Sequence, residues 1–320
     1  MLRHLKRNPR LRAAATLAAL LSSATLVIGQ TTITAPSNKY STEEDVKMGR
    51  DAARQVEEQL PLLGDNQIES YIAGLGDRAV ANIPAEFRHP EFRYTFKVVN
   101  VRDINAFALP GGPMYVNRGM IEAASTEGEV VGVIAHEVSH VALRHGTAQA
   151  SKATKYEIGS IAGQILGAII GGTAGQVVSA TSQFGFGTAF LRFSREYEKQ
   201  ADILGAQIMA RAGYDPLDMA NMFKTIEKQG GSGGPEFLSD HPNPANRSQY
   251  ITSEARLLGV RNPIRNSQAF NEIRAKLKRM SPAPTSEQVM RQGGRRTSQG
   301  RYPEDNQIGR VEPPSSRYQT

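Results

Sequence analysis

Cysteine is absent from all 320 residues of the chain. Its absence excludes disulfide bonds, catalysis by a thiol, cysteine-ligated zinc fingers and a lipid-modified cysteine at a processed N-terminus. Charged residues make up 22% of the chain and hydrophobic residues 39%. This balance is typical of globular proteins and differs from that of polytopic membrane proteins or wholly disordered chains. The chain is long enough for one large domain or two ordinary ones.

The middle of the chain lacks an excess of charge of either sign. The formal net charge is +7, but residues 1–12 carry five Lys/Arg and no acidic residue. Residues 281–320 carry six Lys/Arg against four acidic residues, so the residues between these two ends hold equal numbers of each sign. A neutral body does not indicate a basic binding surface, and we expect no nucleic-acid partner.

Long charge-free apolar runs are scarce, and the first lies near the N-terminus. Ala13–Ile28 follows a basic segment and predicts a secretory signal, with an uncleaved signal anchor or an organelle transit peptide as alternatives. At the other end, Ser281–Thr320 is rich in Pro, Gly, Ser, Gln and Arg and predicts a disordered tail. We therefore expect a leader over 1–30, one domain over 31–280 with its core at about 40–260, and a tail over 281–320.

The second charge-free run, Ile158–Leu191, is rich in Gly, Ser, Thr and Gln. This composition favours a buried helical hairpin, and a lid or a membrane-contacting loop is the alternative. If the protein contacts a membrane, the contact is expected through 13–28 or 158–191.

Hydrophobic periodicity predicts a predominantly helical α+β fold. Ser41 and Glu44 form a capping box before a helical pattern that ends at Pro61, and another helix is expected from Asp65 to Ala81. Strands are expected over Phe92–Val101 and on either side of a Pro-Gly-Gly-Pro turn. Further helical patterns cover 127–144, 194–212, 217–228, 244–258 and 267–280.

His136-Glu137-Val138-Ser139-His140 forms an HExxH pattern. Residues i and i+4 lie on one face of a helix, so His136 and His140 can direct two imidazoles at one metal ion. Glu137 lies about 100° around the helix, from where it can take a proton from an attacking water without binding the metal. The helix begins with an apolar run and is expected to end at Arg144, His145 and Gly146. A helix of this kind is expected to be buried, and its polar side chains then need partners such as a metal ion. The alternative is an exposed helix in which the HExxH spacing is a coincidence.

The third ligand has to come from elsewhere in the chain. His145 is five residues past His140 and is expected to be a charge at the helix end. Glu198 and Asp202 are four residues apart on one helical face, as a ligand and its supporting carboxylate would be. Glu196 faces nearly the opposite way. The alternative for Glu198 is an ordinary surface ion pair, and spacing alone leaves both interpretations open.

Taken together, these motifs resemble the HtpX-like and BepA-like zinc metalloproteases of peptidase family M48. The resemblance rests on HEVSH at 136–140, SREYEKQAD at 194–202, His241-Pro242 with Arg247, and the segment 105–112 followed by Tyr115-Val116 and Arg118-Gly119. It covers roughly residues 40–260. It implies a minigluzincin-type domain, which has a small sheet beside the HExxH helix.

The resemblance also implies the roles of individual residues. One Zn²⁺ per chain would be held by His136, His140 and Glu198, with Glu137 as general base. Asp202 would orient a zinc-binding imidazole.

Downstream, His241 would contact a developing oxyanion or cover the zinc, and Arg247 matches the family's arginine. Two departures concern the rest of the sequence. The membrane-embedded relatives have several hydrophobic spans, where one N-terminal run is expected here. The BepA-like relatives carry a helical-repeat domain after the catalytic part, where one helix and a polar tail are expected here.

The segment Asn105, Ala106, Phe107 and Ala108 is a candidate substrate-binding edge, on which an extended polypeptide adds as a β-strand. Phe107 fits a core position as well as a substrate pocket. The expected function is a zinc-dependent endopeptidase, periplasmic or membrane-associated after secretion across the inner membrane. Misfolded or unassembled envelope proteins are its expected substrates. A chaperone or assembly factor with a latched or structural zinc site is the alternative.

Overall fold

The computed structural model describes residues 30–152, 193–229, 237–238, 241, 246–289 and 291. The two charge-free runs at 13–28 and 158–191, and the tail beyond residue 291, lie outside these residues. Within the described ranges, none of the helices has the length and apolar character needed to cross a bilayer.

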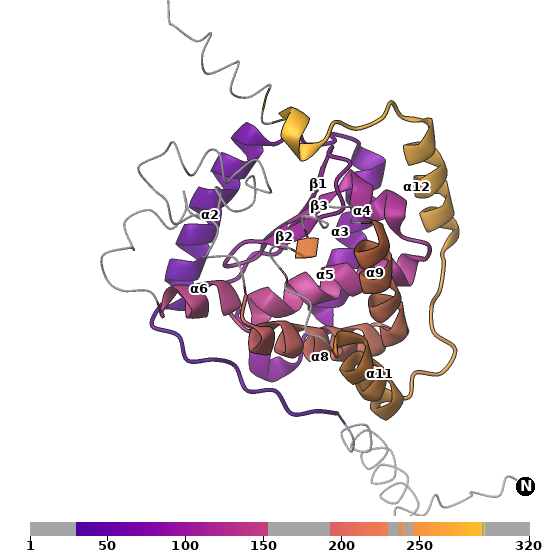
Figure 1. Cartoon of the computed structure of the whole chain (residues 1–320). Coiled ribbons are helices and arrows are strands. Elements are labelled where there is room, and N and C mark those ends of the chain that lie inside the picture. Colours follow the sequence, from indigo (N-terminus) through magenta and orange to yellow (C-terminus); the bar gives the residue numbers. More distant parts are fainter. Residues whose placement is uncertain are drawn as a thin grey trace, which may run out of the picture.

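Helices dominate the chain, and three short strands form one small sheet (Figure 1). This confirms the predominantly helical α+β class. In chain order the elements are α2 (Thr42–Gln59), α3 (Asn66–Ala81), the 3-10 turn η1 (Ala85–Phe87), β1 (Thr95–Val99), β2 (Ala106–Ala108), β3 (Pro113–Asn117), α4 (Arg118–Ala123), α5 (Glu127–Ala142), α6 (His145–Ala150), α8 (Arg195–Arg211), α9 (Pro216–Gln229), α11 (Arg247–Leu258) and α12 (Gln268–Arg279).

The N-terminal helices begin where their caps predict. Ser41 accepts from the backbone N–H of Glu44, and the Glu44 side chain accepts from the N–H of Ser41, which completes the capping box of α2. The Asp65 side chain accepts from the N–H groups of Gln67 and Ile68 at the start of α3. These helix starts depend on residues two or three positions apart, so the sequence specifies them locally.

The sheet has the strand order β1-β3-β2, so β2 is an edge strand. β3 pairs antiparallel with β2 across the predicted turn, where Gly111 and Gly112 take positive φ angles of 74° and 127°. β1 pairs parallel with β3 and is shorter than the predicted Phe92–Val101. The N–H of Arg93 bonds to the Gly111 carbonyl in the turn, and the N–H of Asn100 bonds to the Pro61 carbonyl outside the sheet, so β1 itself is limited to Thr95–Val99.

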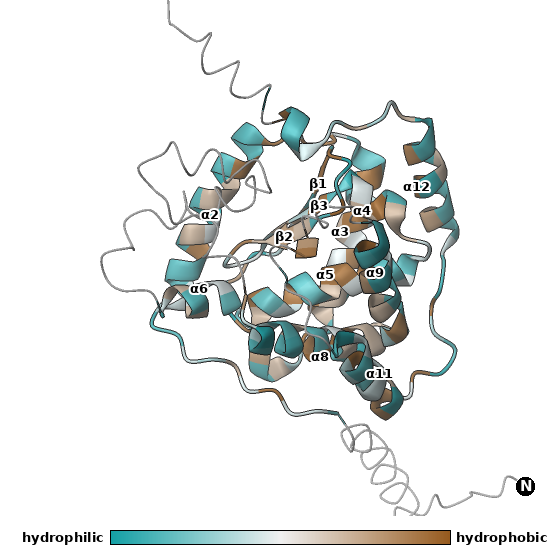
Figure 2. Cartoon of the chain, in the orientation of Figure 1, coloured by the Kyte–Doolittle hydropathy of each residue, from teal (hydrophilic) through white to brown (hydrophobic). Residues whose placement is uncertain are grey.

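Helix α5 is the centre of the fold, and all of its 16 residues are buried. It packs against α8, α9, α3 and strand β2, and Figure 1 shows it running between the sheet and α8. In Figure 2 it is surrounded by other elements, whereas α12 turns a hydrophilic face outward. Polar groups on α5 are therefore enclosed by protein on every side.

Two glycines let the neighbouring helices approach α5 closely. A Cβ atom on Gly132 would lie 2.7 Å from the Cα of Met219 on α9. A Cβ atom on Gly205 of α8 would lie 3.2 Å from the backbone nitrogen of His136. Both distances are below ordinary van der Waals contact, so these helices can hold α5 in place only because glycine is present.

Gly132→Ala is expected to lower the free energy of unfolding by about 1–3 kcal/mol, because the added methyl group must push α9 away from α5. Gly74→Ala is the matched control. Gly74 lies on the exposed face of α3 with nothing within 4 Å of the added carbon, so the same change there should raise stability by roughly 0.5–1 kcal/mol. Urea unfolding of both variants measures the difference, and equal effects of the same sign would contradict this packing.

Residues 30–40 form an extended strap along the lower edge of the domain in Figure 1, ahead of α2. The backbone N–H and the hydroxyl of Thr31 both donate to the buried carboxylate of Glu254 on α11. Gln207 on α8 donates to the Thr31 carbonyl at 2.8 Å. Farther along, the Asn38 amide donates to the hydroxyl of Thr147 on α6 at 2.7 Å. The strap thus joins three helices.

The chain beyond α12 remains on the domain through residue 289. The buried guanidinium of Arg118 donates to the carbonyl oxygens of Leu277 and Ser281. The N–H of Arg102 donates to the Pro284 carbonyl, and Ala283 is buried. Residues 281–289 therefore belong to the domain rather than to the tail that the sequence predicts from Ser281.

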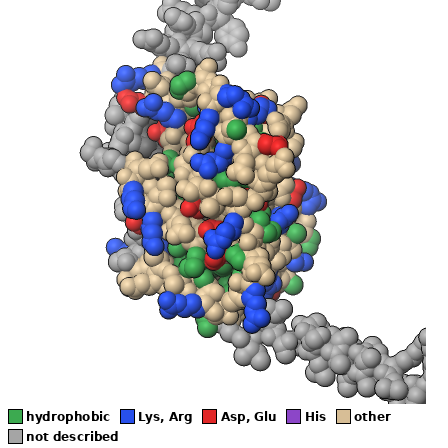
Figure 3. Space-filling view, turned by 90° about the vertical axis from the view of Figure 1, so that its right-hand side faces the viewer, with side chains coloured by type: hydrophobic (Ala, Val, Ile, Leu, Met, Phe, Trp, Pro, Cys, Tyr) green, Lys and Arg blue, Asp and Glu red, His purple; other side chains and the backbone are tan. Residues whose placement is uncertain are grey.

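Basic side chains do not gather into one patch on the face shown in Figure 3. They are scattered among acidic, apolar and uncharged groups.

Candidate metal centre

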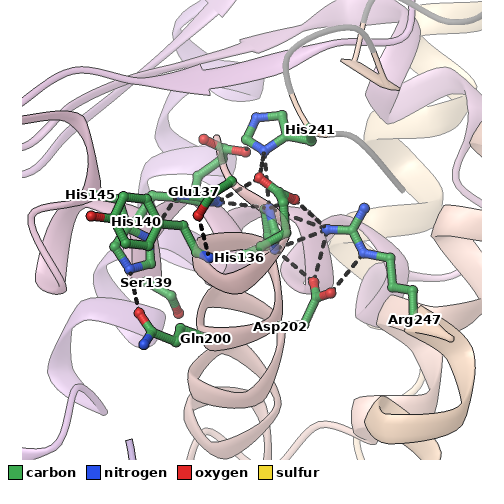
Figure 4. A network of polar contacts seen from close by, with 12 residues as sticks. His136, Glu137, Ser139, His140, His145, Gln200, Asp202, His241 and Arg247 are labelled. Atoms are coloured by element: carbon green, nitrogen blue, oxygen red, sulfur yellow. Dashed lines mark hydrogen bonds and ion pairs between the residues drawn. The ribbon is translucent and has the colours of Figure 1, made fainter. Parts of the chain in front are cut away.

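The two histidines of the HExxH pattern point the same way from α5 (Figure 4). Both are buried, and their Nε2 atoms lie 3.1 Å apart. This is the arrangement that the spacing of four residues predicts for His136 and His140.

Two further side chains complete the cluster from other parts of the chain. Glu198 of α8 places Oε2 3.5 Å from His136 Nε2 and Oε1 3.4 Å from His140 Nε2. His241, from the segment between α9 and α11, places Nδ1 3.2 Å from His136 Nε2 and 3.0 Å from Glu198 Oε1. All four residues are buried, and one ligand atom from each lies within 4.8 Å of every other.

The donor set and its spacing fit zinc. Two atoms each bound about 2.0–2.1 Å from a tetrahedral zinc ion lie roughly 3.3 Å apart, and the contacts between the four side chains span 3.0–3.5 Å. Two histidines and one glutamate are a ligand set found in catalytic zinc sites. Imidazole nitrogens that converge this closely in a buried site need a cation or protons between their lone pairs. The cluster can therefore hold a divalent metal.

Glu137 lies beside the cluster and outside the set of four. Its Oε1 is 3.3 Å from Nε2 of His241. That oxygen is buried and makes no hydrogen bond among the described residues. Burial raises the pKa of Glu137 above its ordinary value, against the lowering effect of the nearby charge on His241. A carboxylate of raised pKa with an oxygen that makes no hydrogen bond is well suited to accept a proton.

Asp202 and Arg247 support the cluster from the side of His136. Asp202 Oδ1 lies 2.9 Å from His136 Nδ1. The Arg247 guanidinium donates to both carboxylate oxygens of Asp202, at 2.7 and 2.9 Å, and to Oε2 of Glu198 at 3.0 Å. Burial disfavours the Asp202 anion, but the Arg247 charge and the bond to His136 outweigh it and lower its pKa. Arg247 therefore touches two carboxylates of the site.

Glu198 is held as an anion in the same way. Burial alone would raise its pKa, but the charge on His241 and the bonds to the three histidines outweigh burial. The pKa of Glu198 accordingly lies well below its ordinary value. The exposed Glu196, two residues earlier on α8, lies outside the cluster.

The prediction for His145 is wrong. Helix α5 ends at Ala142, and Arg144 takes a left-handed conformation with φ 58°, so His145 begins the separate helix α6. Its ring is fully buried, and its Nδ1 lies 3.1 Å from Nδ1 of His140. Burial lowers the pKa of His145 to about 3, so the ring is neutral rather than a charge at a helix end. Gly146, expected as the helix stop, lies inside α6.

The candidate substrate edge lies beside α5. Phe107 is buried and stacks on Tyr115 with ring centroids 5.1 Å apart, so it belongs to the core. Asn105 is also buried, and its side chain accepts from the N–H of Ala106. The N–H of Leu109 and the carbonyl of Asn105 bond to β3. Because alternate residues of a strand bond in opposite directions, the backbone of Ala106 and Ala108 faces away from β3.

A pocket of about 430 Å³, its open mouth included, lies at the end of this edge strand and next to a candidate ligand. Apolar side chains form most of its wall, and the ion pair between Arg144 and Asp45 lies within it, with 2.6 Å between Nε and Oδ2. The other carboxylate oxygen of Asp45 is buried and makes no hydrogen bond among the described residues. The residues that line the pocket are Asp45, Ala108, Leu109, Pro110, Gly111, His140, Val141, Arg144, Gly146, Thr147 and Phe193.

Comparison with known proteins gives one family and several curated relatives. The family model described as peptidase family M48 matches residues 66–255, which include α5, α8 and His241. The chain is 31% identical over 212 residues to the beta-barrel assembly-enhancing protease of Yersinia pestis, covering 65% of this chain and 43% of that protein.

Two further relatives come from Escherichia coli. The beta-barrel assembly-enhancing protease is 28% identical over 73% of this chain and 52% of its own length. Metalloprotease LoiP is 29% identical over 52% of this chain and 64% of its own length. The chain thus spans about half the length of the assembly-enhancing proteases that it matches.

Proposed function

The chain belongs to peptidase family M48, and on this basis we propose that it is a zinc-dependent endopeptidase that hydrolyses peptide bonds of misfolded or unassembled envelope proteins. One observation carries the proposal. Four buried side chains from three separate parts of the sequence converge on one point, and next to them lies the carboxylate of Glu137, whose Oε1 is 3.3 Å from His241 and makes no hydrogen bond among the described residues. A site built only to stabilise the fold would have no need of that carboxylate.

Glu137 is the proposed general base. Its Oε1 takes the proton from the attacking water and afterwards passes it to the nitrogen of the leaving amine. Zinc, when bound by His136, His140 and Glu198, supplies a Lewis acid that polarises the scissile carbonyl and acidifies water. His241 lies against Glu137 and the ligand atoms together, where its ring can contact the developing oxyanion.

The polypeptide substrate is proposed to add to the free edge of β2. Both backbone groups of Ala108 and the carbonyl of Ala106 face away from β3, whereas the N–H of Ala106 is already bonded to the Asn105 side chain. Strand β2 packs directly against α5. The pocket beside Ala108 and His140 would receive a side chain of the bound polypeptide. Asn105 and Phe107 hold this edge in place from inside the domain.

An envelope location is proposed from the sequence and the relatives together. The basic segment and the apolar run Ala13–Ile28 predict export across the inner membrane. Two relatives carry the name beta-barrel assembly-enhancing protease. Exported or membrane-attached protein would meet unassembled envelope proteins as substrates. No nucleic-acid partner is proposed, since the central charges balance.

Casein digestion with and without a chelator tests the proposal. The protein should cleave casein at internal bonds, a chelator of divalent metals should reduce cleavage to background, and added zinc should restore it. Cleavage that persists after complete removal of the metal would overturn the proposal. The proposal would also be overturned if the zinc-loaded protein cleaved neither casein nor an unfolded envelope protein.

A second candidate function is a chaperone or assembly factor whose zinc site is latched shut, and the position of His241 favours it. With His241 among the ligands, four protein side chains surround the site, as in structural zinc sites. The same casein assay on His241→Ala separates the two functions. A latch predicts faster cleavage in the variant, whereas an oxyanion contact predicts a fall of about 10²–10³-fold.

A further inference from the structure

We infer that His145 and Gln200 are positioning residues that fix the ring tautomer of His140, so that the lone pair of its Nε2 faces the metal. The inference rests on the proposed zinc site. It adds to that site a chain of hydrogen bonds running from a metal ligand to the strap at the surface. Figure 4 shows His145 and Gln200 on one side of the cluster and Asp202 and Arg247 on the other.

The strap sets the orientation of Gln200. The side-chain amide of Gln200 lies 3.2 Å from the backbone carbonyl of Thr34. A carbonyl oxygen can only accept, so the nitrogen of the amide must point at Thr34. The amide oxygen is thereby turned inward, where Oε1 lies 3.1 Å from Nε2 of His145.

The orientation of Gln200 in turn fixes the tautomer of His145. An amide oxygen accepts only, so the proton of His145 must be on Nε2. Its Nδ1 is then an acceptor, and it lies 3.1 Å from Nδ1 of His140. The ring is held in this orientation by stacking on Tyr197, with 4.4 Å between ring centroids and 4° between planes.

Only one tautomer of His140 is compatible with this hydrogen bond. Its Nδ1 carries the proton and donates it to His145, so its Nε2 carries the lone pair. That Nε2 atom is the one that faces His136 and Glu198 in the cluster. A metal-binding histidine requires this tautomer, which a hydrogen bond from its other nitrogen usually fixes.

The two imidazole ligands therefore have unlike partners. His136 bonds through Nδ1 to the carboxylate of Asp202 at 2.9 Å, whereas His140 bonds to a neutral imidazole. The left-handed turn at Arg144 makes the second arrangement possible, because it breaks the helix and turns His145 back toward His140. On an uninterrupted helix, a residue five positions later faces a different side.

Zinc affinity of the full chain, measured by competition with a chromogenic chelator, tests the inference. His145→Phe keeps a planar ring on Tyr197 but removes the acceptor, and zinc binding should weaken by about 10–100-fold. His145→Asn places an amide oxygen near the position of Nδ1 and should restore affinity to within a few-fold. His89→Phe is the matched control. His89 bonds to the Ala142 carbonyl at the end of α5 but lies outside the chain of bonds, and this change should leave the affinity unaltered.

Gln200 gives an independent pair of variants should His145→Phe fail to fold. Gln200→Leu removes the acceptor that keeps the proton of His145 on Nε2, and it should weaken zinc binding several-fold. Gln200→Glu keeps an acceptor at this position and should leave zinc binding unchanged. Nitrogen-15 NMR of the zinc-loaded wild type should show a protonated Nδ1 on His140. Unchanged affinity in both His145→Phe and Gln200→Leu would overturn the inference. Failure of the wild type to bind zinc would instead overturn the proposed function.

Discussion

Glu137→Gln should reduce proteolysis by roughly 10²–10⁴-fold, the usual contribution of a general base, while the protein still binds about one zinc per chain. Glutamine has the shape of glutamate but cannot accept the proton from water. The substitution leaves His136, His140, Glu198 and His241 in place, and Oε1 of Glu137 makes no hydrogen bond that the change would break. Casein cleavage together with metal analysis of the purified variant measures both quantities.

The same change at Glu58 is the control for Glu137→Gln. Glu58 lies on the exposed side of α2, so its replacement by glutamine should alter neither activity nor metal content. Zinc lost together with activity in Glu137→Gln would show that Glu137 is a ligand, contrary to the proposed role. Full activity in this variant would assign the base to another residue.

Glu198→Ala should remove zinc outright, the largest effect on metal binding expected for any single change. The carboxylate lies among the ligand atoms of three histidines, and its removal also leaves Arg247 without one of its two anionic partners. Glu198→Gln keeps the volume and the bond-accepting oxygen, so it separates loss of the ligand charge from loss of the fold. Metal content and thermal unfolding of both variants measure the result.

Two other substitutions on α8 should weaken zinc binding less than Glu198→Ala does. Asp202→Asn should weaken zinc binding by about 10–100-fold, because Asp202 orients His136 without entering the cluster. Glu196→Ala, two residues before Glu198 but exposed, should bind zinc normally. If Glu196→Ala loses the metal and Glu198→Ala retains it, the assignment of the third ligand is wrong.

Much of the fold is specified by residues close together in sequence. The capping residues Ser41 and Asp65 place the starts of α2 and α3, and the turn around Gly111 and Gly112 joins β2 to β3. Local sequence does not specify the neighbours of a strand. Strand β3 pairs in parallel with β1 on one edge and antiparallel with β2 on the other, and no local pattern predicts this order. The ends of β1 depend on hydrogen bonds to carbonyl groups elsewhere in the chain.

The site divides in the same way. Residues four apart lie on the same face of a helix. The sequence alone therefore predicts that His136 lies beside His140 and that Glu198 lies on the same face as Asp202. The place of His145 beside His140 does not follow from its spacing, because the helix breaks between the two residues. Arginine rarely takes the left-handed conformation, so no local signal marks the break. No spacing rule brings His241 to the cluster, because its position depends on how α9 and α11 pack on α8; only the resemblance to the family indicates it.

The strap also determines how far the domain can move from a bilayer. Thr31 is fixed to the buried carboxylate of Glu254, and the apolar run ends at Ile28. Three peptide steps span at most about 11 Å. If the run is retained as an anchor, only these three peptide steps separate it from the fixed Thr31. The end of the strap at α8 and α11 is then held at the headgroup layer, and the enzyme works at a fixed height above the membrane. Cleavage of the leader removes that restriction and leaves the domain free to diffuse.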